Sequence, residues 1–168
     1  MDIVAAHSDK ELLEIERLAS AIWHEHYTPI IGKEQVVYML EKFQSFKAMK
    51  EQIFDGYEYY SMTENNELIG YLGIQPRENS LFLSKIYFTK SMRGKGLARI
   101  ALGFLAERAK QLKCTAIELT VNKYNSGTIA AYEKMGFEKV RPAVFDIGGG
   151  YIMDDYIMKK SLVQHAIS

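Results

Sequence analysis

A glycine-rich turn restricts the fold of this chain more than any other feature of the sequence. The segment Arg93-Gly94-Lys95-Gly96-Leu97-Ala98 lies between an apolar, strand-like run, Leu81–Phe88, and a helical pattern. Glycine lets the backbone turn tightly, and the first amides of a helix have no intrahelical partners. Because these amides and the positive end of the helix dipole converge, the turn predicts an anion site, with a pyrophosphate as the natural guest. Arg93, Lys95 and Arg99 add positive charge around it.

Helical and alternating periodicities divide the rest of the chain into short elements. The spacing of Ser8 and Glu11 is that of a capping box, which opens a helix that continues to about Trp23. A connector, His24–Ile31, separates this helix from a second helix that ends near Gly56. The other predicted elements are strands over Ile3–Ala6, Tyr57–Thr63, Glu67–Gln75, Leu81–Phe88, Ala116–Val121, Val140–Ile147 and Tyr151–Met158, and helices over residues 97–112 and Ser126–Met135.

The resulting order, β-α-α-β-β-β-α-β-α-β-β, predicts an α/β fold (α+β by some conventions). Its central sheet is expected to be mixed but mostly antiparallel. The strand–helix–strand passage around the glycine turn implies a right-handed crossover and therefore one parallel, splayed pair of strands. Such a change of pairing can open a crevice for a ligand. We expect one domain over residues 1–160, followed by a C-terminal tail over residues 161–168.

The charge balance gives no support to a nucleic-acid or membrane partner, although a local basic patch is compatible with it. Lys plus Arg and Asp plus Glu number 21 each, so no net charge favours nucleic acid or an anionic membrane.

The sequence also shows no targeting or membrane segment. Polar residues interrupt the first ten positions, unlike a signal peptide, and no apolar run approaches the ~20 residues of a membrane span. The expected compartment is the cytoplasm. A single cysteine, Cys114, leaves no intramolecular disulfide and no cysteine-rich metal site, and we expect no metal.

Two other phosphate-binding motifs compete for the glycine turn. A P-loop requires Lys followed by Ser or Thr after its second glycine, and the turn has neither. A dinucleotide fingerprint requires a third glycine where Arg99 stands, although Glu118 lies at about the distance of its ribose-binding acid. The antiparallel strands expected before the turn also disagree with a nicotinamide-binding fold. A plain glycine loop before a helix remains the simpler alternative.

The turn and a second segment together resemble a known family. Arg93, Gly96 and Ala98 match the coenzyme A signature of the GNAT acetyltransferases, which reads Arg or Gln, two residues, Gly, one residue, and Gly or Ala. The later segment, Leu119 to Asn122 followed by Asn125 and Ala131-Tyr132-Glu133-Lys134-Met135-Gly136-Phe137, is similar to the second motif of that family. The resemblance covers nearly the whole chain, although the N-terminal third agrees only in outline.

The resemblance implies acetyl-CoA as acyl donor and a set of residues that hold it. Backbone groups of Ile86 and Phe88 would bind the pantetheine arm, with the Phe88 amide placed to stabilise the oxyanion. The pyrophosphate would lie on the amides of Gly94, Lys95, Gly96, Leu97, Ala98 and Arg99, beside Arg93. Asn125 matches an asparagine that contacts the cofactor arm. An ordinary helix N-cap is an equally good reading of Asn125.

The same resemblance implies direct acetyl transfer to an amine, without an acyl-enzyme. Tyr132 matches the tyrosine that protonates the departing thiolate, a step that a positioned phenol can perform. An aromatic packed on an amphipathic helix is the alternative for Tyr132. The amine must also lose a proton, so a base is expected, and Glu118 on the following strand suits this role. A solvated outward carboxylate is an equally good reading of Glu118.

The acceptor is expected to be a small primary amine, such as a polyamine. The inter-helix connector, with Trp23, His24, His26 and Tyr27, would line its pocket, and Asp155 of the last hairpin would attract its positive charge. Surface histidines and exposed carboxylates are the commoner cases for such residues. Acetylation of a protein N-terminus or lysine, and a non-catalytic acyl-CoA sensor, remain the alternative functions. The aromatic strand Tyr57–Tyr60 is a candidate homodimer interface.

Overall fold

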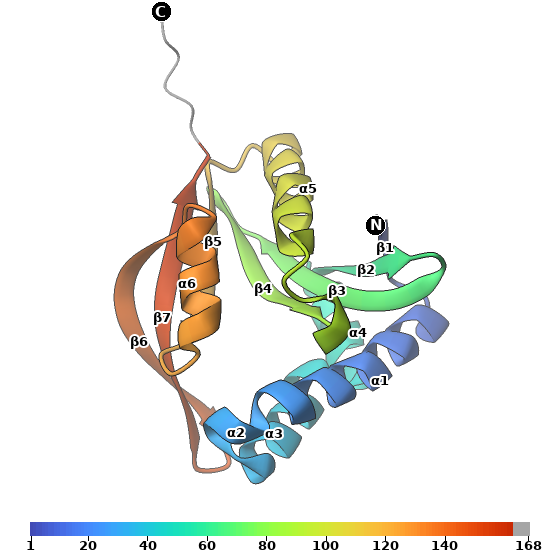
Figure 1. The fold of residues 1–168 in the computed structure, drawn as a ribbon, viewed down its shortest axis with the longest axis vertical. Coiled ribbons are helices and arrows are strands. Elements are labelled where there is room, and N and C mark those ends of the chain that lie inside the picture. The colour runs from blue at the N-terminus through green and yellow to red at the C-terminus, as the bar shows by residue number, and fades with distance from the viewer. Residues whose placement is uncertain (163–168) are drawn as a thin grey trace, which may run out of the picture. The chain divides into compact units, whose positions relative to one another are not determined.

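A computed structural model describes residues 1–162 of the chain as seven strands and a set of helices (Figure 1). Residues 163–168, most of the predicted tail, lie outside the described part. The chain divides into two compact units, which are described separately. The first contains Met1–Gln75 and Ser84–Leu97, and the second contains Pro76–Leu83 and the chain from Ala98 onward.

The strand order confirms the predicted mixed sheet. In the first unit neighbouring strands follow the order β1-β2-β3-β4, and in the second they follow β4-β5-β7-β6, with β4 contributing one half to each. Leu81 and Leu83 of β4 pair with Ile117 and Leu119 of β5 in parallel, whereas β5 with β7 and β6 with β7 are antiparallel. The parallel pair therefore lies where the crossover through the glycine turn predicts it.

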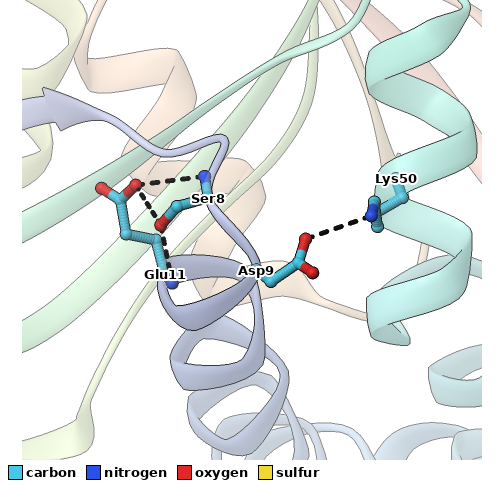
Figure 2. A network of polar contacts seen from close by, with 4 residues as sticks. All are labelled: Ser8, Asp9, Glu11 and Lys50. Atoms are coloured by element: carbon cyan, nitrogen blue, oxygen red, sulfur yellow. Dashed lines mark hydrogen bonds and ion pairs between the residues drawn. The ribbon is translucent and has the colours of Figure 1, made fainter.

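The first helix of the first unit starts at the predicted capping box. Glu11 donates its backbone N–H to the Ser8 hydroxyl (3.2 Å), and the Glu11 carboxylate accepts the Ser8 backbone N–H (3.2 Å), as Figure 2 shows. An ion pair of 3.1 Å between Asp9 and Lys50 joins the start of this helix, α1 (Asp9–His26), to α4 (Phe46–Phe54). The side of α1 that is buried carries Leu12, Ile15, Ala19, Ile22 and Trp23.

The connector expected between the first two helices is shorter than predicted. Helix α1 continues to His26, and a single helical turn, α2 (Thr28–Ile31), follows directly. Pro29 does not break the chain there because it occupies the first turn of a helix, where its missing N–H has no partner to lose. Gly32, with a φ of 87°, ends this turn.

The predicted second helix is not continuous. It is divided into α3 (Lys33–Met39), a π-helical segment η1 (Leu40–Gln44), and α4. The apolar spacing continues through the break, which is why periodicity alone predicts one helix. Polar interactions accompany the break in the helix. Ser45 caps α4 by accepting the N–H of Ala48 (3.1 Å), and the Phe43 carbonyl accepts hydrogen bonds from the side chains of Gln52 and Lys85.

The strands of the first unit form its sheet against these helices. They are β1 (Asp2–Ala5), β2 (Glu58–Glu64), β3 (Glu67–Pro76) and β4 (Ser80–Phe88), of which the second half of β4 belongs here. Tyr59, Met62, Tyr71, Leu72 and Ile74 are fully buried in this core. A short 3-10 turn, η2 (Lys90–Met92), leads from β4 to the glycine turn.

The second unit contains α5 (Leu97–Gln111, apart from its first residue), β5 (Ala116–Asn122), α6 (Ser126–Lys134), β6 (Glu138–Gly148) and β7 (Tyr151–Ser161). Leu81, Leu83, Ile117, Leu119 and Met158 occupy the buried face of its sheet. Strand β6 is an edge strand, mostly exposed, with two irregularities of register and a proline, Pro142, that cannot donate a hydrogen bond.

No helix within residues 1–162 is both long enough and apolar enough to cross a membrane.

Candidate active site

The glycine turn has the backbone that an anion site requires. Gly94 and Gly96 adopt φ angles of 77° and 76°, which side chains rarely tolerate, and no atom lies within 4 Å of the position a Cβ would take. Helix α5 begins directly after them at Leu97, so its first amides have no intrahelical partner. The side chains of Lys95, within the turn, and Arg99, in the first turn of α5, are exposed. The glycine backbone and the start of the helix thus provide N–H groups, and both of these cations are open to solvent.

Arg93 is engaged in holding the turn in place. Its guanidinium forms an ion pair of 2.6 Å with Glu25 of α1 and donates from Nε to the Phe88 carbonyl (3.1 Å). The Glu25 carboxylate neutralises much of the charge of Arg93. Lys95 and Arg99 are therefore better placed than Arg93 to balance a bound anion, while Arg93 fixes the turn relative to the end of β4.

The end of β4 is packed closely against β3. A side chain at Gly70 would come within 2.5 Å of the Tyr87 carbonyl and 2.9 Å of the Phe88 ring, so only glycine fits there. The Thr89 amide donates to the Ile69 carbonyl (2.9 Å). Phe88 is buried and Ile86 half-buried, as positions with a backbone role on a strand can be. The backbone of this predicted cofactor-binding strand is thereby fixed.

Aromatic rings gather at the C-terminal end of α1. The rings of Trp23 and Tyr27 lie 4.5 Å apart, and Tyr87 of β4 lies 5.6 Å from Trp23 and 6.0 Å from Tyr27. The Tyr27 and Tyr87 hydroxyls are 3.4 Å apart. His26 contacts Tyr27 edge-on at 4.9 Å, whereas His24 is exposed. Three of the four predicted connector residues, Trp23, His26 and Tyr27, therefore belong to one ring cluster with Tyr87, a residue that the sequence pattern does not single out.

A buried lysine is the main feature of the first unit that the sequence analysis misses. Lys85 is 5% exposed, and its Nζ donates to the Phe43 carbonyl (2.9 Å) and to Gln52 Oε1 (3.2 Å). Its Nζ also lies 5.0 Å from the centre of the Tyr59 ring. Burial lowers the pKa of Lys85 to about 7. Two acceptors match the two N–H groups of a neutral amine, which agrees with this direction of shift.

One face of the sheet in the second unit is polar. Register pairs place Glu118 opposite Lys159, and Asn122 opposite Asp155, with Thr120 between them on the same face. Glu118 is half-buried, but Asp155 is only 4% exposed. Burial raises the pKa of Asp155 to about 6, with a smaller contribution from the charge of Asp154, while a hydrogen bond from Thr120 opposes the rise.

Asn125 occupies the N-cap position of α6 without acting as a cap. Its side chain accepts no hydrogen bond from the first turn of the helix, and Asn125 is 5% exposed. Within residues 1–162 its Nδ2 group is buried with no hydrogen-bond partner. Since buried donors are nearly always satisfied, this amide marks a place where an acceptor is missing. Asn125 therefore occupies the N-cap position, as one of the two predictions has it, but its side chain does not make the capping hydrogen bond.

Tyr132 lies on α6, two turns after Asn125. Its ring contacts the Phe137 ring edge-on at 5.4 Å, and Phe137 is buried in the core. Tyr132 itself is half-buried. The packing of one side of its ring fixes the phenol, so the packing role and the predicted acid role are compatible.

The predicted site residues thus fall into two sets. In the first unit Ile86, Phe88, Arg93 and the glycines of the turn form one connected stretch, and Trp23 and Tyr27 adjoin its strand through Tyr87. In the second unit Glu118 and Asp155 share a sheet face, and Asn125 and Tyr132 share α6 and its start. Lys85 and Tyr87 carry a weak signal in the sequence, since each is a polar group inside an apolar strand run.

Comparison with known proteins shows which family this chain matches and which solved structures share its fold. Residues 15–137 match the family described as the acetyltransferase (GNAT) family. An uncharacterized N-acetyltransferase of Escherichia coli, YjgM, is 32% identical over 89 residues, and one of Bacillus subtilis, YdgE, is 35% identical over 60 residues. These matches span 53% and 38% of the two relatives, about half their length or less. The PaiA N-acetyltransferase of Thermoplasma acidophilum, solved in complex with coenzyme A, has a TM-score of 0.78 at 21% identity, over 96% of this chain and 99% of that one.

Proposed function

Because the chain belongs to the acetyltransferase (GNAT) family, we propose that it transfers an acetyl group from acetyl-CoA to a primary amine, with a small molecule such as a polyamine as acceptor. The observation that carries this proposal is the buried, unpartnered Nδ2 of Asn125. A carbonyl or phosphate oxygen of the cofactor arm supplies the acceptor that this amide lacks.

The residues of the glycine turn also fit acetyl-CoA. Gly94 and Gly96 have open space where a Cβ would stand, and their amides with those of Lys95, Leu97, Ala98 and Arg99 would hold the pyrophosphate. Lys95 and Arg99 would balance its charge. The backbone of Ile86 and Phe88 would bind the pantetheine arm along the end of β4.

The other predicted site residues would donate and accept the protons that the reaction moves. Bound acetyl-CoA supplies the thioester, whose sulfur departs when the amine attacks. Tyr132 would donate its phenolic proton to that sulfur. A primary amine is neutral in only about one molecule in 2,500 at pH 7, which costs about 4.6 kcal/mol unless a base assists. The polar face of β5 and β7 offers carboxylates for this purpose, among them Glu118. Cys114, buried past the end of α5, does not suit a covalent nucleophile.

The first test of this proposal is ligand-dependent thermal stability. Acetyl-CoA and free CoA at 100 times their dissociation constants should each add about 2.7 kcal/mol of stability, and NADH should add none. Stabilisation by NADH alone would refute the cofactor assignment. The wild-type protein should then release thiol from acetyl-CoA with polyamines or other small amines. Transfer only to peptide N-termini or peptide lysines would replace the small-molecule acceptor by a protein.

A variant of Tyr132 separates an enzyme from a sensor. Tyr132→Phe keeps the ring that packs on Phe137 but removes the proton, so we expect unchanged acetyl-CoA binding and a maximal rate lower by about 100-fold or more. Binding of acetyl-CoA by the wild type without transfer to any amine or peptide would favour the sensor. An unchanged rate in Tyr132→Phe would remove Tyr132 from the mechanism.

A further inference from the structure

We propose that Asp155 is the carboxylate that accepts the proton of the acceptor ammonium, and that Thr120 positions it. This assignment rests on the proposed function and names the base of that same site. It differs from the sequence analysis, which gives the base role to Glu118 and only an attractive role to Asp155.

The burial of Asp155 distinguishes it from the other carboxylates of the same face. Asp155 is 4% exposed, although it lies on the polar face of β5 and β7 rather than among the apolar residues of the other face. Glu118 is half-buried and directly opposite Lys159, whose ammonium can neutralise it across the strands. The neighbouring Asp154 is already paired with Lys123 at 2.8 Å. Asp155 is thus the buried carboxylate of this hairpin without a lysine opposite it.

A short chain of contacts connects Asp155 with the unpartnered amide of Asn125. Asp155 is the register partner of Asn122, and the Asn122 carbonyl accepts the Asn125 backbone N–H at 3.0 Å. Asn125 carries the buried Nδ2 that lacks an acceptor. All three residues belong to the second unit, so their relation does not depend on any other part of the chain. The buried carboxylate is therefore one register pair and one backbone hydrogen bond away from the residue whose amide lacks an acceptor.

The charges around Asp155 suit a base that works near neutral pH. Asp155 faces Thr120 and Asn122 on β5 and Ala143 on β6, and Arg141, two register pairs further, is the next β6 residue on the same face. Burial and then Asp154 raise the pKa of Asp155 to about 6, against the Thr120 hydrogen bond and the charge of Lys123. A base with a pKa near the working pH is both ionised and able to accept a proton.

The proton balance of the reaction closes with this assignment. Asp155 takes one proton from the ammonium, and the nitrogen lone pair then forms the N–C bond as the C–S bond breaks. The sulfur keeps the bonding electrons and takes the proton of Tyr132. The nitrogen loses its second proton to water as the amide forms. Tyr132 regains a proton from water and Asp155 releases its own, so one proton appears in solution for each turnover.

The test compares Asp155→Asn with Asp154→Asn, the adjacent carboxylate whose side chain projects to the other face. At saturating acetyl-CoA, the wild-type kcat/KM for the amine should fall on the acidic side with an apparent pKa near 6. Asp155→Asn should lower the rate on the neutral plateau at least 100-fold and remove that acidic limb. It should leave acetyl-CoA affinity, measured by calorimetry, within twofold. Asp154→Asn should keep the plateau rate within about twofold.

Two further measurements keep the assignment falsifiable if Asp155→Asn is unstable. Thr120→Val removes the hydrogen bond that lowers the pKa of Asp155, so the acidic limb should move to higher pH. In the ligand-free protein, the 13C signal of the Asp155 carboxyl should titrate above pH 5. Titration below pH 4.5, or an acidic limb that survives in Asp155→Asn and disappears in Glu118→Gln, would overturn the assignment while acetyl transfer stands. A wild type that acetylates no amine would overturn the function and the assignment together.

Discussion

Replacing Lys85 by methionine should abolish a rise in stability between pH 7 and pH 9. The folded pKa of Lys85 is about 7, against 10.5 for an ordinary lysine. Below pH 7 both the folded and the unfolded states carry the charge, and burial of that charge reduces stability. Between pH 7 and 10.5 the unfolded state binds more protons than the folded state, so the free energy of unfolding rises with pH. Above pH 10.5 Lys85 is neutral in both states, so it no longer makes the free energy of unfolding depend on pH.

The magnitude follows from the size of the shift. Each pKa unit corresponds to 1.36 kcal/mol, so the full window from 7 to 10.5 amounts to about 5 kcal/mol, of which about 2 kcal/mol falls between pH 7 and 9. Measurements should stay below pH 9.5. Burial raises the pKa of Tyr59, and ionisation of that tyrosine in the unfolded state reduces stability at higher pH.

Urea denaturation followed by the fluorescence of the single tryptophan measures this dependence. Lys85→Met should fold, because the Phe43 carbonyl keeps a bond from Gln52 (3.1 Å) and Gln52 keeps one from Tyr59. We expect the stability difference, wild type minus variant, to rise by about 2 kcal/mol from pH 7 to 9. Lys47→Met, at an exposed position of α4, should leave the wild-type slope unchanged. A difference that stays flat over this range would refute a neutral, buried Lys85.

Three further predictions test other parts of the structure. Asn125→Ala loses no hydrogen bond within the described residues, so its stability should stay within about 0.5 kcal/mol of the wild type, while acetyl-CoA affinity falls about three- to tenfold in calorimetry. If Asn125→Ala lowers the free energy of unfolding but leaves acetyl-CoA affinity unchanged, the ligand role of Asn125 is contradicted. Gly96→Ala should cost about 1 kcal/mol through its φ of 76° alone, whereas Gly103→Ala inside α5 should stabilise by a similar amount; equal thermal shifts for both would refute the strain argument. Ser8→Ala should cost about 1 kcal/mol in denaturation and should release the Glu11 pKa, which the Ser8 hydroxyl holds below its usual value, as an NMR titration would show.

Local rules of the chain predict most of the fold. The capping box at Ser8 and the tight turn at Gly94 and Gly96 follow from short-range chemistry, and the parallel pair of β4 and β5 follows from the order of the elements and the right-handed crossover rule. The π-helical break at Leu40–Gln44 does not, because the bonds that accompany it come from Gln52 and from Lys85, 42 residues after Phe43. Apolar periodicity is blind to such long-range polar contacts.

The candidate site likewise has residues that the sequence predicts and residues whose environment depends on long-range contacts. Motif spacing identifies the glycine turn, Asn125 and Tyr132, since these residues adjoin elements that the periodicity also defines. The burial of Asp155 and Lys85 is unexpected, because charged residues are rarely buried and a strand pattern places them in solvent. Only strand register and tertiary packing reveal which charged side chain is removed from water.

The strand order β5-β7-β6 has a consequence for how the second unit can be made. Strand β7 is the last of the seven to be synthesised, yet it occupies an inner position between β5 and β6. Until Ser161 has left the ribosome, β6 has no neighbour and the outer edge of β5 remains open. A nascent chain therefore cannot complete this sheet strand by strand as it emerges. A chain that terminated early, before Tyr151, would lose the strand that joins β5 to β6, and with it the place of Asp155.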